Sequence, residues 1–271
     1  MSAPLLAVDG DSFAHRAYHG LPKSVNRNAV VGFTNMIVRL WEQEQPRAVV
    51  VGWDTLEVPT YRHEAFPAYQ SGREFDASLL EQLAMLPQLC TALGFVVGKA
   101  PGYEADDFLA AAVAHEEGRG GTVLVASGDR DAFQLASERT TIIQPIRGVS
   151  ELARIGPEAV RERYGVEPAQ VPDFIALRGD PSDKLPGAKG VGPKTAADLL
   201  RQYESLEAML ADGRFSAQAD ELRLFRRIAA MDAEAPLADV PDAEPDWNGG
   251  AEVARGWGLN NVADRLAARA Q

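Results

Sequence analysis

Three short hydrophobic runs, each followed within a few residues by aspartate, most strongly constrain how this chain can fold. The runs are Leu5 to Val8, Ala48 to Val51 and Thr122 to Val125, and the acids after them are Asp9, Asp54, Asp129 and Asp131. A continuous apolar run of this length is typical of a strand that is buried on both faces of a parallel sheet. The carboxyl ends of parallel strands meet at one edge of the sheet, where ligands bind. The pattern therefore predicts an α/β fold that gathers these acids in one crevice.

Amphipathic segments alternate with these runs in the first half of the chain. We expect helices over residues 29–44, 78–93 and 105–116. Alternating strands and helices predict a mostly parallel central sheet with helices on its faces. Beyond residue 156 the strand signal fades and short helices follow. We therefore divide the chain into an α/β core at 1–155 and a helical region at 156–271.

Two more acidic clusters accompany the acids at the strand ends. One opens the helix expected from residue 105 and the other lies in a Gly-Asp-Pro-Ser-Asp segment; their members are Glu104, Asp106, Asp107, Asp180 and Asp183. So many carboxylates in one crevice would repel each other strongly without cations. Mg²⁺ and Mn²⁺ are hard cations that prefer oxygen ligands and act in pairs on phosphoryl groups. The acids therefore predict a site for two or more such ions.

A purely structural role remains open for some of these acids. Asp180 precedes a proline and is a candidate helix N-cap, with Asp183 in the first turn that would follow. Glu104 and Asp107 lie where a helix dipole favours carboxylates, although each would gain only about 0.3–1 kcal/mol. That gain is too small to account for three acids in four residues.

The net charge of −12 is a weak argument against nucleic acid as a partner. Nine of the acids are candidate metal ligands, whose charge the ions would offset, and six more lie at 232–246 in a base-free segment that we expect to be solvated. The sequence has no apolar run of membrane-spanning length and no signal-peptide pattern. Its single cysteine, Cys90, excludes an intrachain disulfide and favours a reducing cytoplasm.

Three of the five lysines, Lys184, Lys189 and Lys194, fall within eleven residues around a Gly-x-Gly motif at 190–192. A hairpin of this kind that enters a helix exposes backbone N–H groups, to which the lysines add positive charge. Such a surface binds phosphates without reading bases. An ordinary αα-hairpin, in which the glycines only form the turn, is the structural alternative.

The segment 61–73 has no clear helix or strand pattern, and it mixes basic with aromatic residues. The basic residues are candidates for phosphate contacts and the aromatic residues for stacking on bases. They are Arg62, Arg73, Tyr61, Phe66 and Tyr69. The alternative is a surface loop that is held by a partly buried aromatic anchor.

These motifs, in this order, resemble those of the bacterial and phage 5′→3′ exonuclease and flap endonuclease family, which includes the N-terminal nuclease domain of bacterial DNA polymerase I. The resemblance runs from Asp9 to about Leu200 and rests on the Asp9-Gly10 pair, Arg62-His63-Glu64, Glu104-Ala105-Asp106-Asp107, Gly128-Asp129-Arg130-Asp131 and Gly179 to Asp183 with the hairpin after it. It implies a PIN-like 5′ nuclease core with an arch segment at about 61–80. It also implies a helix–hairpin–helix element at about 184–200.

By this resemblance, each group of residues has an expected role. Two or three Mg²⁺ or Mn²⁺ ions would be held by Asp9, Asp54, Glu104, Asp106, Asp107, Asp129, Asp131, Asp180 and Asp183. Basic positions near the reacting phosphate are Arg16 and Arg73. The residues expected to contact DNA are Arg62, Tyr69, Gln70, Lys184, Lys189, Gly190, Gly192, Lys194 and Thr195. Several family members bind K⁺ at the hairpin, so K⁺ is expected there.

The implied activity is hydrolysis of DNA phosphodiester bonds in replication and repair, as a 5′→3′ exonuclease and flap endonuclease. The expected substrates are DNA with 5′ flaps, nicks or 5′ ends, and RNA-primed 5′ ends, for a cytoplasmic monomer without membrane contact. Two positions depart from the family pattern: Gln70 stands where many relatives have lysine, and Lys184 where asparagine is common. The complete set of acids argues against an inactive paralogue.

Two alternative functions come from other classes. Asp9 and Asp11 after the first strand also resemble the nucleophile and general acid of haloacid-dehalogenase-type phosphatases. That alternative leaves the acids at 104–107 and the lysine-bearing hairpin without a role. The other alternative is a non-catalytic module that binds branched DNA.

Overall fold

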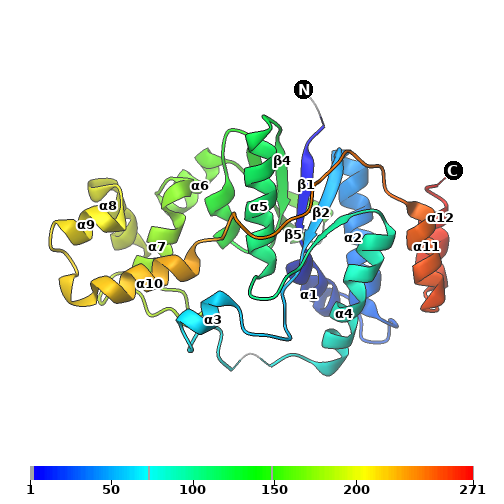
Figure 1. Cartoon of the computed structure of the whole chain (residues 1–271), viewed down its shortest axis with the longest axis horizontal. Helices are drawn as coiled ribbons and strands as arrows, with labels where there is room; N and C mark the ends of the chain where they lie inside the picture. Colours follow the sequence, from blue (N-terminus) through cyan, green and yellow to red (C-terminus); the bar gives the residue numbers. More distant parts are fainter. Residues whose placement is uncertain (1–2, 73, 148, 271) are drawn as a thin grey trace.

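The chain folds into a six-stranded sheet with helices on both faces and a cluster of helices at one end (Figure 1). The computed structural model describes residues 3–72, 74–147 and 149–270. The strands are β1 (Leu5–Asp9), β2 (Ala48–Gly52), β3 (Val96–Gly98), β4 (Val123–Ala126), β5 (Thr140–Arg147) and β6 (Glu151–Ile155). Their order is β3-β2-β1-β4-β5-β6, and only the pair β5 and β6 is antiparallel. The predicted mostly parallel sheet is confirmed.

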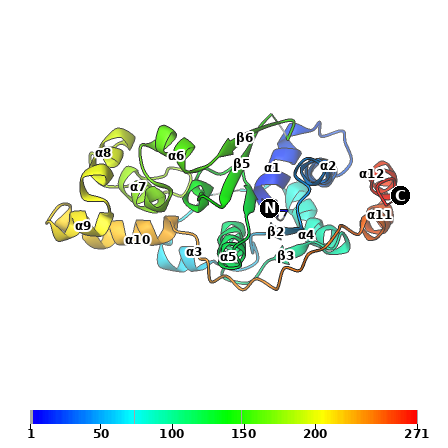
Figure 2. The same cartoon turned by 90° about the horizontal axis from the view of Figure 1, so that it is seen from above.

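Both faces of the central strands are buried, because successive side chains of β1 point into two different cores. Leu6 and Val8 join the core formed with α1, α2 and α4, whereas Leu5 and Ala7 join the core formed with α5. Figure 2 shows α2 and α5 on opposite sides of the sheet. The helices of this part are α1 (Gly10–Gly20), α2 (Asn28–Glu44), α3 (Tyr61–Ala65), α4 (Ala77–Ala92) and α5 (Ala105–Gly118), with a short 3₁₀ turn, η1 (Asp131–Leu135). The three helices predicted for this half match α2, α4 and α5 to within two residues.

The helical cluster follows β6 and lies at the left of Figure 1. It contains α6 (Pro157–Tyr164), α7 (Val171–Arg178), α8 (Pro193–Tyr203), α9 (Leu206–Ala211) and α10 (Ala219–Ala229), with two 3₁₀ turns, η2 (Pro168–Gln170) and η3 (Ser216–Gln218). Helix α7 contacts both α8 and α10. The predicted C-terminal helical region is confirmed in this part of the chain.

Residues 230–246 form an extended strap that crosses the core from the helical cluster to the far end of the molecule (Figure 1). We expected this acid-rich segment to be solvated, but Val240 is buried. The Ala243 N–H donates to the Arg47 carbonyl at 2.9 Å, and Arg47 Nη1 donates to Asp242 Oδ1 at 2.8 Å. The acids of the strap are solvated as expected, since five of the six are exposed and Asp232 is partly buried, while Val240 and Arg47 attach the segment to the core.

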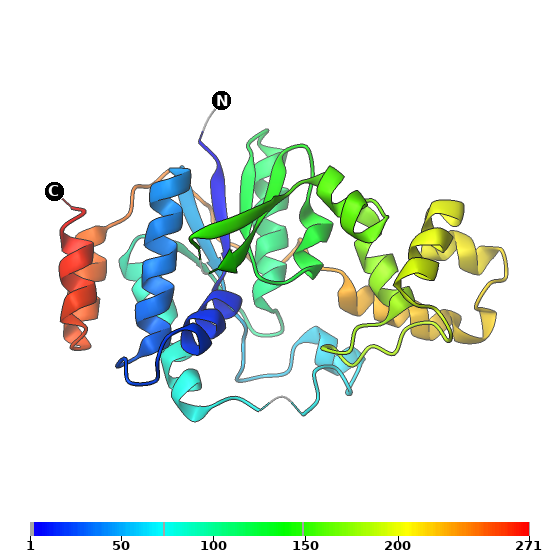
Figure 3. The same ribbon diagram turned by 180° about the vertical axis from the view of Figure 1, so that it is seen from behind.

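The last two helices are α11 (Trp247–Gly256) and α12 (Asn260–Ala267), and they pack on the core at the end opposite to α8 and α9 (Figure 3). The ring of Trp247 lies edge-on to that of Trp41 in α2, with centroids 5.1 Å apart. A single helical region over 156–271 is therefore wrong for these two helices, which belong to the core. Among the described residues, no helix is long and apolar enough to cross a membrane.

Candidate metal centre

The carboxyl ends of β1, β2 and β4 open into a cleft of about 940 Å³. Eight of the nine predicted metal-binding acids line it: Asp9, Asp54, Glu104, Asp106, Asp129, Asp131, Asp180 and Asp183. These acids come from five separate segments of the chain, so only the fold brings them together. In sheets of this kind ligands usually bind where the strand order reverses, which here lies between β1 and β4.

Asp9 is the last residue of β1 and also the N-cap of α1. Its Oδ1 accepts a hydrogen bond from the Ser12 N–H at 2.9 Å, and its Oδ2 accepts one from Ser127 Oγ at 2.7 Å. Burial raises the pKa of Asp9 to about 7, despite these two hydrogen bonds. A cation beside Asp9 would favour its ionised form.

Asp54 is tied to the start of α5 by a close approach between β2 and that helix. Its Oδ1 accepts a hydrogen bond from the Ala105 N–H at 2.8 Å, and its own N–H donates to Asp11 Oδ2 at 2.7 Å. A Cβ on Gly52 would overlap the carbonyl oxygen of Ala105. Glycine at position 52 therefore lets β2 and α5 bring Asp54 close to Glu104. The pKa of Glu104 is raised first by burial and also by the charge of Asp54, although Arg62 opposes the shift.

Asp106 carries an oxygen that lacks a protein partner. Its Oδ1 is buried and accepts no hydrogen bond from the described residues, whereas its Oδ2 lies 3.2 Å from Arg62 Nη2. Burial raises the pKa of Asp106 well above its ordinary value, although Arg62 opposes the shift. The pKa of Asp131 is also raised, first by burial and then by the charge of Asp129. Because a buried acceptor without a partner is costly, a cation in the cleft would stabilise this arrangement.

The donor set of the cleft fits Mg²⁺ or Mn²⁺, because carboxylate oxygens predominate in it. In the described part of the chain, no three His, Cys, Asp or Glu side chains are already arranged around one point as a metal-binding group. Mg²⁺ characteristically keeps several waters and takes only one or two carboxylates together with substrate phosphates. A wide cleft with dispersed carboxylates suits that mode of binding.

Asp107 is the predicted metal ligand that does not line the cleft. It is fully buried, and its two oxygens accept hydrogen bonds from Arg62 Nη1 and Nη2 at 3.0 and 2.8 Å. Tyr61 Oη, the Asp232 N–H and the Glu104 N–H also donate to it. Its carboxylate is therefore fully engaged within the protein. The prediction that Asp107 holds a metal ion is wrong, and its structural reading as an acid in the first turn of a helix is correct.

Arg62 is the buried partner of this acid and has no surface for DNA. Its side chain is only 1% exposed and lies beneath the cleft, where Nε also donates to the Ile228 carbonyl at 2.9 Å. The prediction that Arg62 contacts DNA phosphates is therefore wrong. The residue instead ties α3 to the start of α5 and to the end of α10.

Tyr69 and Phe66 anchor the arch segment to the protein. Tyr69 is 3% exposed and its Oη donates to Glu104 Oε2 at 2.8 Å, so its ring is not available to stack on a base. Phe66 packs edge-on against Phe225 of α10 with ring centroids 5.7 Å apart. The prediction that Tyr69 contacts DNA is wrong, and the alternative of an aromatic anchor is correct.

The remaining predicted residues of the reacting centre take different positions. Gln70 lines the cleft, and its Nε2 donates to Asp183 Oδ1 at 3.0 Å. Arg16 on α1 is partly exposed and points toward Gly128, where a Cβ would lie 3.8 Å from Arg16 Nη2. Arg73 falls outside the described residues. The roles of Gln70 and Arg16 stay predictions.

The Gly-x-Gly motif forms a turn between α7 and α8, as a helix–hairpin–helix requires. Gly190 adopts a left-handed conformation with φ of 78°, and Gly192 is the N-cap of α8. The side chains of Lys184, Lys189, Lys194 and Thr195 are exposed, and those of the three lysines form no ion pair with the described acids. This surface is therefore open to phosphates, and its binding role stays a prediction.

Family models match the chain over almost its whole length. The model described as 5′-3′ exonuclease, N-terminal resolvase-like domain, covers residues 4–165, and the model described as 5′-3′ exonuclease, C-terminal SAM fold, covers residues 166–246. The chain belongs to the 5′-3′ exonuclease family. The predicted family is confirmed, and the phosphatase alternative is wrong.

Relatives and solved structures agree with this family. The chain is 40% identical over 255 residues to DNA polymerase I of Mycobacterium bovis, a match that covers 88% of the chain and 28% of the relative. It is 36% identical over 263 residues to the thermostable DNA polymerase I of Thermus thermophilus, a match that covers 90% of the chain and 31% of the relative. The chain thus spans less than a third of the length of these relatives. Its fold is similar to that of phage T5 5′-exonuclease bound to zinc, with a TM-score of 0.71 at 19% identity over 97% of this chain and 96% of that one. It is also similar to the catalytic core of Rad2 in complex with DNA substrate, with a TM-score of 0.61 at 15% identity. That match covers 98% of this chain and 91% of the Rad2 chain.

Sequence reasoning missed several residues that line the cleft of this 5′-3′ exonuclease family member. Asp11 has a role only in the phosphatase alternative, and none of the motifs includes Arg178, although both line the cleft. Arg178 Nη2 lies 3.1 Å from Asp180 Oδ2, and its guanidinium lies 5.3 Å from the ring centroid of Phe174. Its position two residues before Asp180 was the one signal in the sequence.

Proposed function

We propose that this chain is a metal-dependent 5′ nuclease that hydrolyses DNA phosphodiester bonds at 5′ flaps, nicks and 5′ ends. The proposal is carried by one observation: eight carboxylates from five segments line a single cleft. The exposed lysines of the hairpin begin at Lys184, directly after the last of these acids. In this proposal, phosphate binding and phosphate chemistry would thus lie next to each other.

Two or three Mg²⁺ or Mn²⁺ ions would be held by the acids of the cleft, and they would supply the activation of water and the stabilisation of the leaving 3′-oxygen. One group of ligands is Asp9, Asp54, Glu104 and Asp106, and the other is Asp129, Asp131, Asp180 and Asp183. Arg130 and Arg178 also line the cleft and would orient the phosphate by charge-assisted hydrogen bonds. Gln70 would place a neutral donor beside the second group.

The duplex would be bound by the helical cluster, residues 156–230, through contacts that carry no sequence information. Lys184, Lys189 and Lys194 would contact phosphates, and the backbone around Gly190 and Gly192 would approach the DNA closely. The same proposal includes a K⁺ ion, which would bind to backbone carbonyl oxygens of the hairpin. The arch segment at 61–80 would position the single-stranded 5′ end above the cleft.

The biological setting that we propose is DNA replication and repair in the cytoplasm, by a monomer that acts as both exonuclease and flap endonuclease. RNA-primed 5′ ends are included among the proposed substrates, because phosphate-based recognition does not require a particular sugar. Branched, nicked and single-stranded ends would share the same reacting centre.

The test is cleavage of labelled 5′-flap, nicked and single-stranded DNA with Mg²⁺, with Mn²⁺ and with EDTA. Cleavage should require a divalent ion, and Asp129→Asn should reduce it by orders of magnitude while flap binding persists. Asp239→Asn, the same change at an exposed acid of the strap, is the matched control and should cleave normally. Binding of flap DNA without cleavage under every metal condition would instead establish the non-catalytic module.

A further inference from the structure

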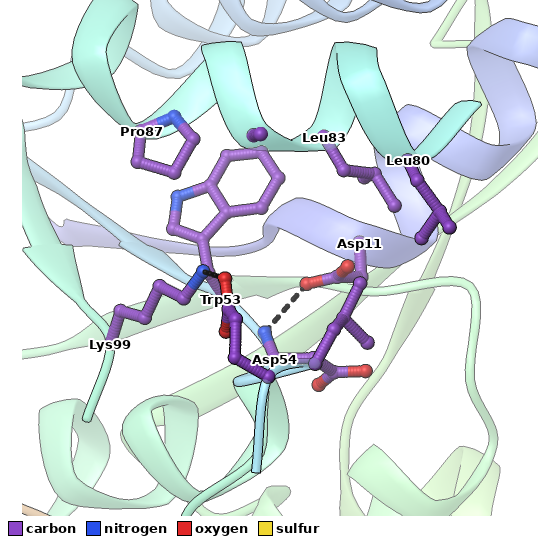
Figure 4. A pocket seen from close by; sticks show the side chains of 10 residues that line it. Asp11, Trp53, Asp54, Leu80, Leu83, Pro87 and Lys99 are labelled. Atoms are coloured by element: carbon purple, nitrogen blue, oxygen red, sulfur yellow. Dashed lines mark hydrogen bonds and ion pairs between the residues drawn. The ribbon is translucent and has the colours of Figure 1, made fainter. Parts of the chain in front are cut away.

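A second cavity, of about 200 Å³, opens beside the acid cleft (Figure 4). Its apolar wall is formed by Trp53, Leu56, Leu80, Leu83, Ala84 and Pro87. Figure 4 shows the indole of Trp53 beneath α4, between Pro87 and Leu83, with Lys99 nearby. Asp11 and Asp54 line both this cavity and the cleft, so the two adjoin each other.

Exposed apolar side chains concentrate at the mouth of this cavity. Four large hydrophobic side chains in the described part of the chain are strongly exposed. Two of them, Leu56 at 42% and Leu80 at 38%, line the cavity, and a third, Val58 at 41%, lies two residues after Leu56. Exposed apolar groups that gather at one place indicate a binding surface. The fourth, Ile146, lies on β5 away from this surface.

The cavity also combines an aromatic wall with a cation at its rim, which suits a base rather than an aliphatic ligand. The indole of Trp53 forms part of the wall, and its Nε1 is covered by neighbouring atoms without a hydrogen-bond partner among the described residues. Lys99 Nζ lies 3.3 Å from Glu57 Oε1 at the rim and keeps a partly exposed side chain. A flat aromatic ring with an attached phosphate would match these apolar and aromatic walls and the cation.

We propose that this cavity binds one nucleobase of the 5′ flap, at the unpaired nucleotide next to the scissile phosphate. The proposal rests on the nuclease function proposed above. A cavity of roughly 150 Å³ in another protein holds one benzene ring, so 200 Å³ is enough for a single base but not for a stacked pair. The site would recognise the ring shape and tolerate sequence, because every base presents an aromatic face.

The position of the cavity, on the α4 side of the cleft, determines which part of the DNA can reach it. The helical cluster, which would hold the duplex, lies on one side of the carboxyl end of β1, where Asp9 is located, and α4 lies on the other (Figures 1 and 3). A strand that passes from the duplex over the acids would therefore arrive at α4 with its displaced 5′ portion. A base from the downstream duplex would be on the wrong side.

The experiment compares 5′-flap substrates in which a single abasic site is moved along the flap. With wild-type protein and Ca²⁺ in place of Mg²⁺ to prevent cleavage, the abasic site at the first unpaired nucleotide should weaken binding about tenfold, and more distant sites should not. Ala84→Leu fills the cavity from the exposed face of α4, so it should weaken binding of the intact flap and abolish the effect of the abasic site. Gln88→Leu places a leucine one turn further along the same face of α4, at an exposed position that does not line the cavity, and should behave as wild type.

Each outcome separates the cavity from the nuclease proposal. If intact flap is cleaved but no abasic position changes binding, or if Ala84→Leu keeps the wild-type sensitivity, the base-binding cavity is refuted and the nuclease function stands. If no DNA is cleaved with any divalent ion, the nuclease function itself is refuted. Thermal melting of Ala84→Leu establishes that it folds, and Lys99→Gln provides a second variant, which should weaken intact-flap binding without changing the effect of the abasic site.

Discussion

Asp107→Asn should destabilise the fold, although Asp107 is the direct neighbour of the proposed metal ligand Asp106. The buried carboxylate accepts five hydrogen bonds, two of them from Arg62. Removal of one partner from a buried ion pair costs about 3–5 kcal/mol. Arg62 would still have two carboxylate partners, because its Nη2 lies 3.2 Å from Asp106 Oδ2 and its Nη1 lies 3.4 Å from Glu104 Oε2. We therefore expect a loss at the lower end of this range, about 3 kcal/mol in the free energy of unfolding.

The assay is urea unfolding and thermal melting without divalent ions. A loss of about 3 kcal/mol corresponds to a decrease in Tm of roughly 6–12 °C for a chain of this size. Asp106→Asn is the matched comparison: it removes a carboxylate with an unpartnered buried oxygen, so metal-free stability should be unchanged or higher while cleavage is lost. If Asp107→Asn melts within 2 °C of wild type, or if its destabilisation adds fully to that of Arg62→Met, the structural assignment of the pair is refuted.

Three further predictions concern the cleft and its surroundings. Burial raises the pKa of Asp9 to about 7, so its contribution to metal-free stability is complete below its ordinary pKa of 3.8 and is lost as the pH rises through 7. Mg²⁺ should therefore raise the Tm more at pH 8 than at pH 6. Equal increases in Tm at the two pH values would contradict this prediction. Lys194→Ala should weaken duplex binding and reduce the slope of log K against log salt by roughly one unit, whereas Arg255→Ala on α11 should change neither; an unchanged slope for Lys194→Ala would make the hairpin a structural turn only. Gln70→Lys should raise the single-turnover cleavage rate at least about tenfold, because it places a positive charge beside Asp183 in the cleft. A rate equal to wild type would place residue 70 outside the reacting centre.

The sheet and its acids could be predicted because their signals are local in the sequence. An apolar run marks a buried strand, and an acid directly after it must lie at the carboxyl edge of a parallel sheet. Asp9, Asp54 and Asp129 accordingly lie in one cleft, as their positions after the strands predict. The helix boundaries of α2, α4 and α5 followed from their periodicity in the same way.

The burial of Arg62 could not be predicted, because its partners lie far away in the sequence. It contacts Asp107, 45 residues on, and the carbonyl of Ile228, 166 residues on. A basic residue among aromatic ones has the same local pattern whether it faces DNA or a buried carboxylate. The attachment of the strap to the core could not be predicted for a similar reason, since its acidic composition indicates exposure and gives no sign that Arg47 lies beside it.

Gly52 bears no functional group, yet it sets how closely two halves of the cleft can approach. Any side chain there would meet the Ala105 carbonyl and push the start of α5 away from the end of β2. A homologue could thus keep all of its acids and still have lost the spacing between them through this one position. When inactive members of the family are sought by inspecting acidic motifs, the residue at position 52 should be inspected with them.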